Sequence, residues 1–130
     1  MRDPITALVA VLIVLEIKHF VCDFPLQTLK MVRSKGTYLH PAGIAHSAIH
    51  ALATVSCFLV VTPTLLLGAA IIVGEFLIHY HIDWGKEQIN RWMKYTAAKT
   101  GFWWALGADQ LVHNLTYVAI AVLLVRTILG

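Results

Sequence analysis

The segment Glu75-Phe-Leu-Ile-His-Tyr-His-Ile-Asp83 closes an apolar run that begins near Leu65. On an α-helix, positions i, i+4 and i+8 share one face, so Glu75, His79 and Asp83 point the same way. Two carboxylates and an imidazole on one side of an apolar helix do not fit a solvated surface. The segment therefore predicts a buried or membrane-embedded helix whose polar stripe faces other helices.

Three other apolar segments carry ionisable pairs with the same four-residue spacing. The pairs are His19 with Asp23, His46 with His50, and Asp109 with His113. Because each pair spans about one helical turn, each presents two ionisable side chains on one face. The repetition indicates one shared site formed by four helices.

The composition is typical of a polytopic membrane protein. Hydrophobic residues make up 58% of the 130 residues and charged residues only 13%. We therefore predict an all-α fold, a four-helix transmembrane bundle forming a single domain over residues 1–130. An amphipathic helix at the membrane interface is expected over about 84–99, where tryptophans and lysines interleave. The predicted spans, which approach or exceed the roughly 20 residues that cross a bilayer, are about 4–24, 44–61, 65–82 and 102–129.

Positive charge is distributed unevenly between the two sides of the predicted bundle. The loops after the first and third spans hold seven lysines and arginines, whereas the opposite side holds only Arg2 and Arg126. The positive-inside rule places both basic loops in the cytoplasm. Both termini are then expected on the periplasmic or extracellular side of a bacterial inner membrane. The seven residues are Lys30, Arg33, Lys35, Lys86, Arg91, Lys94 and Lys99.

The expected partners follow from the same observations. The formal net charge of +3 is explained by membrane topology, and no nucleic-acid-binding module accompanies it, so nucleic acid is not expected. Basic loops beside a bilayer attract anionic headgroups, so membrane lipids are expected. Because the chain is small, we also expect a homo-oligomer.

This orientation places all four polar groups in the cytoplasmic half of the bilayer, in one layer. An ionisable residue at the centre of a membrane helix costs about 2.5–3.5 kcal/mol, so these groups must be neutralised by one another, by water or by a cation. Imidazoles and carboxylates suit a divalent metal such as Zn, Mn or Fe, and the number of donors allows one or two ions. The candidate metal ligands are His19, Asp23, His46, His50, Glu75, His79, Asp83, Asp109 and His113.

Other readings of the polar residues stay open. A structural hydrogen-bond network or a proton relay would use the same side chains. His40 lies in a loop and His81 points away from the polar stripe, so neither is a preferred ligand. Gln27 and Gln110 fit hydrogen bonds between helices, or groups that orient the ligands.

The motifs resemble those of an uncharacterised bacterial family of small membrane proteins. The resemblance covers nearly the whole chain and implies no activity, because that family is known as a domain of unknown function. A weaker similarity, carried by His46-Ser-x-x-His50 and the aspartates that follow, links the chain to predicted membrane-bound metal-dependent hydrolases. The motifs that carry the first resemblance are His19-x-x-x-Asp23-Phe24-x-x-Gln27, a basic loop with Lys35, His46-x-x-x-His50, His79-x-x-x-Asp83-x-x-Lys86 and Asp109-Gln110-x-x-His113.

The function favoured by the sequence is a metal-dependent hydrolase at the cytoplasmic face of the membrane. Bound metal would lower the pKa of a water towards ~7, and Glu75 or Asp109 would serve as the general base. Asp83 is a further choice of base if it is not a ligand. The basic loops would attract a lipid-like or phosphorylated amphipathic substrate.

Two alternatives belong to other functional classes. A di-iron or haem redox protein would use histidine ligands from the same helices. A proton or cation transporter, or a non-enzymatic membrane subunit, would need a polar path through the outer half of the bundle. The predicted spans carry no charge in that half, so transport ranks below catalysis. The histidine ligands of the redox alternative are His46, His50, His79 and His113.

Overall fold

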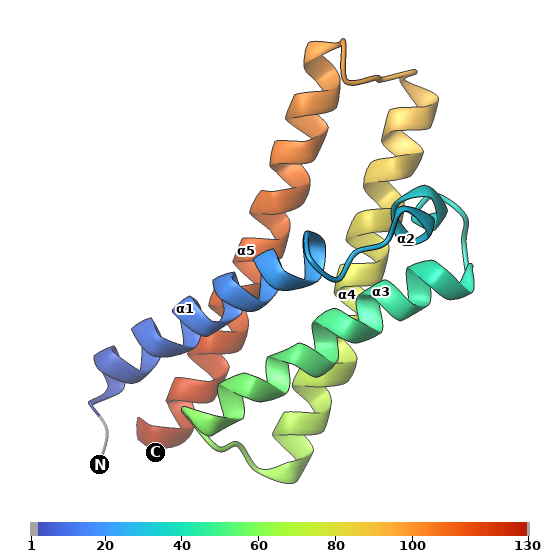
Figure 1. Ribbon diagram of the computed structural model, residues 1–130. Coiled ribbons are helices and arrows are strands. Elements are labelled where there is room, and N and C mark those ends of the chain that lie inside the picture. The colour runs from blue at the N-terminus through green and yellow to red at the C-terminus, as the bar shows by residue number, and fades with distance from the viewer. Residues whose placement is uncertain (1–2, 130) are drawn as a thin grey trace.

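The computed structural model describes residues 3–129, so Arg2 of the charge comparison lies outside the described residues. No strand occurs in this part of the chain, and the predicted all-α class is confirmed. Four helical segments are long and apolar enough to cross a membrane: α1, α3 together with η1, α4 and α5. In chain order the elements are α1 (Pro4–Asp23), α2 (Leu29–Ser34), α3 (Pro41–Ala53), the 3₁₀ helix η1 (Thr54–Leu59), α4 (Leu65–Trp92) and α5 (Thr100–Leu129) (Figure 1).

Local sequence sets where the helices begin. The carboxylate of Asp3 accepts a hydrogen bond of 2.8 Å from the amide of Thr6, and proline occupies the first turn of α1. At the start of α3, His40 Nδ1 accepts from the amide of Ala42 at 3.1 Å, and Pro41 follows directly. Both arrangements satisfy amides that have no partner within the helix.

The helices form a bundle built around one long antiparallel pair. Helices α4 and α5 run side by side, and their connection, residues 93–99, lies at the far end from the beginning of α1 and the end of α5 (Figure 1). Helix α1 packs against α5 and α3, and α3 packs against α4. The last turn of α1, the first turns of α3, and the middle of α4 and α5 therefore meet in one region.

The segment predicted as a separate interfacial helix has a different structure. Helix α4 continues without interruption to Trp92, and residues 93–99 form a turn-rich connection. No proline interrupts the hydrogen-bond ladder after Asp83, and the helix ends just before Lys94, whose φ is 51°. With a rise of about 1.5 Å per residue, 28 residues extend about 42 Å, beyond the ~30 Å hydrocarbon core of a bilayer.

The half of the bundle away from the 93–99 connection has an apolar core. Its side chains come from α1, η1, α4, α5 and the turn after η1, and Tyr117 lies at the boundary with the polar layer. Buried polar and charged residues instead gather at the level where α1 ends. The buried members of the core are Ala7, Val11, Leu15, Cys57, Val61, Ile71, Tyr117, Ile120, Ala121, Leu124 and Val125.

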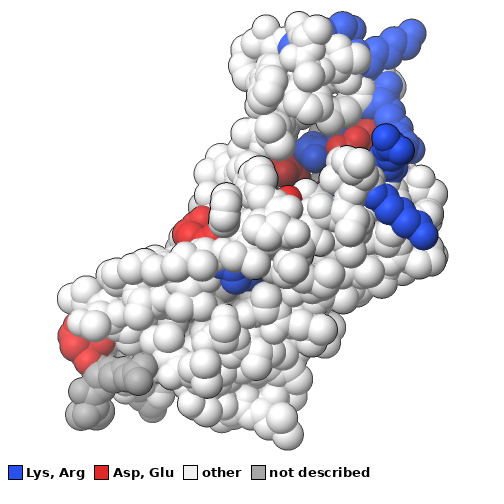
Figure 2. All heavy atoms as spheres, viewed as in Figure 1, with Lys and Arg blue, Asp and Glu red and all other residues white. Residues whose placement is uncertain are grey.

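Surface charge follows the same division. On the face drawn in Figure 2, lysine and arginine side chains gather over α2 and the neighbouring part of α4, and the body below is almost without charge. Many large apolar side chains of the helices are exposed, including Ile13, Ile17 and Leu66. A surface of this kind suits contact with lipid chains.

Candidate metal centre

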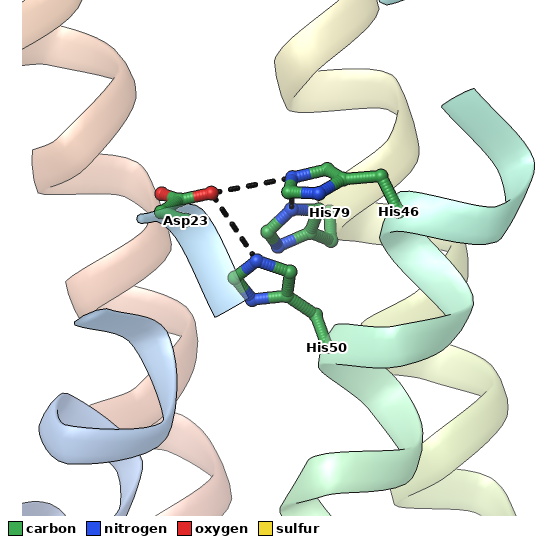
Figure 3. A group of neighbouring side chains, drawn as sticks. All are labelled: Asp23, His46, His50 and His79. Atoms are coloured by element: carbon green, nitrogen blue, oxygen red, sulfur yellow. Dashed lines mark hydrogen bonds and ion pairs between the residues drawn. The ribbon is translucent and has the colours of Figure 1, made fainter. Parts of the chain in front are cut away.

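Four side chains from three helices converge beside the end of α1 (Figure 3). Oδ1 of Asp23, the last residue of α1, lies 3.2 Å from Nε2 of both His46 and His50 on α3. Nε2 of His79 on α4 lies 3.4 Å from Nε2 of His46. The three imidazoles are buried, and the Asp23 side chain is 13% exposed. One oxygen and three nitrogens thus face a common point.

Three of the six distances among these atoms match a metal coordination shell. A tetrahedral ion with bonds of about 2.0–2.1 Å holds its ligand atoms about 3.3–3.4 Å apart. The three distances above are 3.2, 3.2 and 3.4 Å. The four residues each offer a ligand atom, and these atoms all lie within 4.8 Å of one another. The group Asp23, His46, His50 and His79, here called the primary group, can therefore hold a metal ion.

The Nδ1 atoms of the three histidines are less well satisfied by hydrogen bonds. Nδ1 of His46, His50 and His79 is buried and has no hydrogen-bond partner within residues 3–129. A histidine that binds metal through Nε2 normally donates its Nδ1–H to a carboxylate or carbonyl. The Nε2 atoms of the three histidines are thus placed to bind a metal, whereas their Nδ1 atoms lack the usual carboxylate or carbonyl acceptors.

A second group shares one histidine with the first. His79, Asp83 and His113 also offer ligand atoms within 4.8 Å of one another. Oδ2 of Asp83 lies 3.4 Å from His46 Nε2 and 3.5 Å from His79 Nε2, while Oδ1 lies 3.8 Å from His113 Nε2. Asp83 therefore faces both groups with different oxygens. An imidazole nitrogen binds one ion. If two ions are bound, His79 can therefore be a ligand of only one of them.

Lys35 brings a positive charge into the centre. Its ammonium lies 2.9 Å from Oδ2 of Asp83 and 3.9 Å from Oδ1 of Asp23, and its side chain is only 9% exposed. The carbonyl of the next residue, Gly36, accepts hydrogen bonds from Gln88 at 2.9 Å and Arg91 at 2.7 Å, which tie this segment to α4. In the sequence, Lys35 is one of three basic residues, with Lys30 and Arg33, in the loop after the first predicted span.

His19 contacts the primary group but is not a member of it. Its Nε2 lies 3.1 Å from Oδ2 of Asp23 and 3.1 Å from Oε1 of Gln110, and its Nδ1 lies 2.6 Å from the hydroxyl of Tyr117. His19 thus contacts Oδ2 of Asp23, whereas His46 and His50 contact Oδ1, so His19 helps to orient the carboxylate. Tyr117 was not among the predicted residues, although it follows His113 by four positions on the same stripe of α5.

Glu75 has a different partner from the one we predicted. Its carboxylate accepts a hydrogen bond from the ammonium of Lys18, and both side chains are almost fully buried. The same ammonium donates to the backbone carbonyl of His50 at 3.1 Å and lies 4.5 Å from the centre of the Tyr117 ring. Because a lysine already neutralises Glu75, the carboxylate belongs to neither metal group.

The remaining predicted residues occupy clear positions. Asp109 Oδ1 lies 3.7 Å from Nε2 of His113, and its Oδ2 accepts from Gln110 at 3.1 Å. His81 is exposed and its Nδ1 lies 2.7 Å from the carbonyl of Leu77, so it faces away from the centre. Of the nine candidate ligands, the two groups bring together Asp23, His46, His50, His79, Asp83 and His113.

Comparison with known proteins gives one match. The model of the family described as "Protein of unknown function (DUF3307)" matches residues 11–129. Neither the curated proteins nor the solved structures include a match. Both metal groups, Lys35 and the pair of Lys18 and Glu75 lie inside the matched region.

Proposed function

The chain belongs to the DUF3307 family of proteins of unknown function, and from this premise we propose that it is a metal-dependent hydrolase of the bacterial inner membrane. The substrate would be a lipid-like or phosphorylated amphipathic molecule reached from the cytoplasmic face. The family match agrees with the uncharacterised family named from the motifs. The proposal rests chiefly on the convergence of four donor atoms in the primary group, three of whose mutual distances match those of a tetrahedral shell.

The donor set favours zinc in the primary group. Three imidazoles and one carboxylate are typical zinc ligands, and the three close distances among their donor atoms are those of a tetrahedral shell. Bound zinc would supply an activated water and polarise the scissile group. Of the four donors, Asp23 is the one that also lines an open hollow, so that side is where a substrate would approach.

Asp109 is the better placed of the two predicted general bases. It lines the same hollow as Asp23, and its Oδ1 accepts no hydrogen bond within the described part of the chain. Its nearest imidazole is His113, at 3.7 Å. Glu75 is held by Lys18, so a proton-accepting role falls to Asp109 in this proposal.

The decisive experiment is elemental analysis of the full chain purified without chelator. We expect about one zinc, manganese or iron per chain, and loss of most of it in the His46→Ala/His50→Ala double variant. His81→Ala is the matched control, because that imidazole is exposed and faces away from the centre. Phosphate release from phosphatidic acid should stop with chelator and return with added metal. Unchanged metal content in the double variant would refute the proposal.

A di-iron redox centre is the second candidate, favoured by Asp83. The two oxygens of this carboxylate face the two groups separately, which is the arrangement of a carboxylate that bridges two ions. Such a centre would give about two irons per chain and absorb visible light. A colourless protein without iron would remove this candidate.

A further inference from the structure

We propose that a hollow beside the metal centre binds the phosphate headgroup of an anionic lipid, with Lys35 and Lys86 as its cationic contacts. This inference rests on the proposed function and names its substrate class. The hollow has a volume of about 340 Å³ and lies among the end of α1, the α2 segment, α4 and α5. That volume is in the range typical of small-molecule sites, about 300–1,000 Å³. Asp23 of the primary group lines it, and so does Asp109, whose Oδ1 lies 3.7 Å from Nε2 of His113 in the second group.

Beside three carboxylates, Asp23, Glu87 and Asp109, two lysines line the hollow. Their side chains are only 9% and 15% exposed, although lysines near membrane helices usually extend to water. The ammonium of Lys35 pairs with Asp83 at 2.9 Å, and that of Lys86 pairs with Glu87 at 3.0 Å. Both residues line the hollow, so a phosphate bound there would meet two cations.

Metal binding would free Lys35 for this role. Its ammonium lies against Asp83 and 3.9 Å from Asp23, the carboxylates that an ion in the two groups would also engage. A divalent cation a few ångströms from a lysine repels it and weakens its attraction to the shared carboxylates. An anion in the hollow would then be its best remaining partner. Metal and phosphate should therefore strengthen each other's binding.

The apolar surroundings select a lipid over free phosphate. Phe24, Val32 and Leu106 also line the hollow, and Phe24 is 68% exposed. Lys86 and Asp109 additionally line a second, largely apolar groove of about 490 Å³ between α4 and α5. A headgroup held by Lys86 would have an apolar surface for its chain on either side. Other residues of this groove are Ile82, Ile89, Trp104, Ala108 and Val112.

The test measures binding of short-chain phosphatidic acid to the full chain in detergent micelles. Phosphatidylcholine of the same chain length and inorganic phosphate are the comparison ligands. The variants are Lys35→Met and Lys86→Met, with Lys35→Arg as the conservative replacement. Lys94→Met is the matched control, because this lysine lies in the exposed 93–99 connection and does not line the hollow. Metal content is measured for every sample.

We expect the dissociation constant for phosphatidic acid to rise about tenfold or more in Lys35→Met and in Lys86→Met, as for the loss of a charge-assisted hydrogen bond. Lys35→Arg should retain most of the affinity, and Lys94→Met should change it less than about twofold. Phosphatidylcholine and inorganic phosphate should bind more weakly than phosphatidic acid. Removing metal with chelator should weaken phosphatidic acid binding.

Two results would overturn the inference: unchanged affinity in both hollow variants, or an equal loss in Lys94→Met, which indicates general surface attraction. Inorganic phosphate that binds as tightly as phosphatidic acid would overturn the choice of a lipid. The proposed function is tested independently of the hollow: it would be refuted if the chain purified without chelator contained no metal. Lysine-dependent lipid binding by a metal-free chain would support the hollow and refute the metal coupling. Bound metal with no effect of either lysine on lipid binding would support the metal centre and refute the hollow as a phosphate site.

Discussion

Lys18 and Glu75 bury opposite charges next to the backbone of His50, which belongs to the primary group. A lysine and a glutamate in apolar helices are costly apart, and together they largely cancel that cost. The pair also fixes α1 to α4, because Lys18 lies on the first helix and Glu75 on the fourth. We infer that the pair holds together the helices that carry the ligands, since Glu75 belongs to neither metal group.

Breaking this pair should be more damaging than removing it. Glu75→Ala leaves the Lys18 ammonium buried without its partner and should lower the free energy of unfolding by about 3–5 kcal/mol. The double variant Lys18→Met/Glu75→Leu should recover most of that loss. Unfolding in detergent, followed by circular dichroism, measures both. A double variant less stable than Glu75→Ala would contradict the assignment.

The hydroxyl of Tyr117 should matter for metal affinity through His19. Tyr117→Phe removes the partner of His19 Nδ1 but keeps the ring that Lys18 contacts. His19 would then orient Asp23 less firmly, and metal affinity should fall about tenfold or more, as for other residues that orient ligands. Competition with a chelating dye gives the dissociation constant.

Tyr38→Phe is the control for that measurement. The Tyr38 hydroxyl lies 3.3 Å from Nε2 of the exposed His81, away from the metal groups. This variant should bind metal as the unaltered chain does. An equal loss of affinity in both variants would show that the Tyr117 hydroxyl has no special role.

At the scale of the helices, the close packing of α4 against η1 depends on a glycine. A β-carbon added at Gly68 would lie 3.3 Å from side-chain atoms of both Phe58 and Pro63, whereas one at Gly74 would meet nothing within 4 Å. Both glycines lie within α4, so the intrinsic helix preference of a replacement is similar at the two positions. The difference between them therefore reports on packing.

Gly68→Val should accordingly be less stable than Gly74→Val by about 1–3 kcal/mol, the usual cost of overpacking. The matched glycine removes the effect of the β-branched side chain on helix formation. Thermal unfolding of the two variants in the same detergent measures the difference. Equal stabilities would mean that η1 moves away without cost.

The helical stripes could be predicted because they depend only on the period of the α-helix. Pairs such as His46 with His50 and Asp109 with His113 lie on one face wherever the helix is placed. The partner of Glu75 could not be predicted in this way, because it depends on how the bundle places α1 relative to α4. The same holds for Lys35, whose position depends on the path of the chain between α2 and α3. The continuation of α4 to Trp92 was missed because polar composition was interpreted as a change of element.

At the scale of the whole molecule, positive charge at one end predicts the orientation in the membrane. Thr96 lies in the 93–99 connection and Thr62 in the turn between η1 and α4, and both are exposed. We expect a membrane-impermeant maleimide to label Thr62→Cys in intact cells and Thr96→Cys only after the inner membrane is opened. The native Cys22 and Cys57 are buried and give a low background. The reverse pattern of labelling would invert the proposed orientation.

The apolar core beneath the polar layer has an electrical consequence in that orientation. A membrane potential falls mainly across low-dielectric material, here the tightly packed half of the bundle that contains Val11, Cys57 and Leu124. An ion that enters from the cytoplasm would reach its ligands after crossing little of that field. Occupancy should then follow cytoplasmic metal concentration and be nearly independent of voltage, as suits a catalyst and not a conductor.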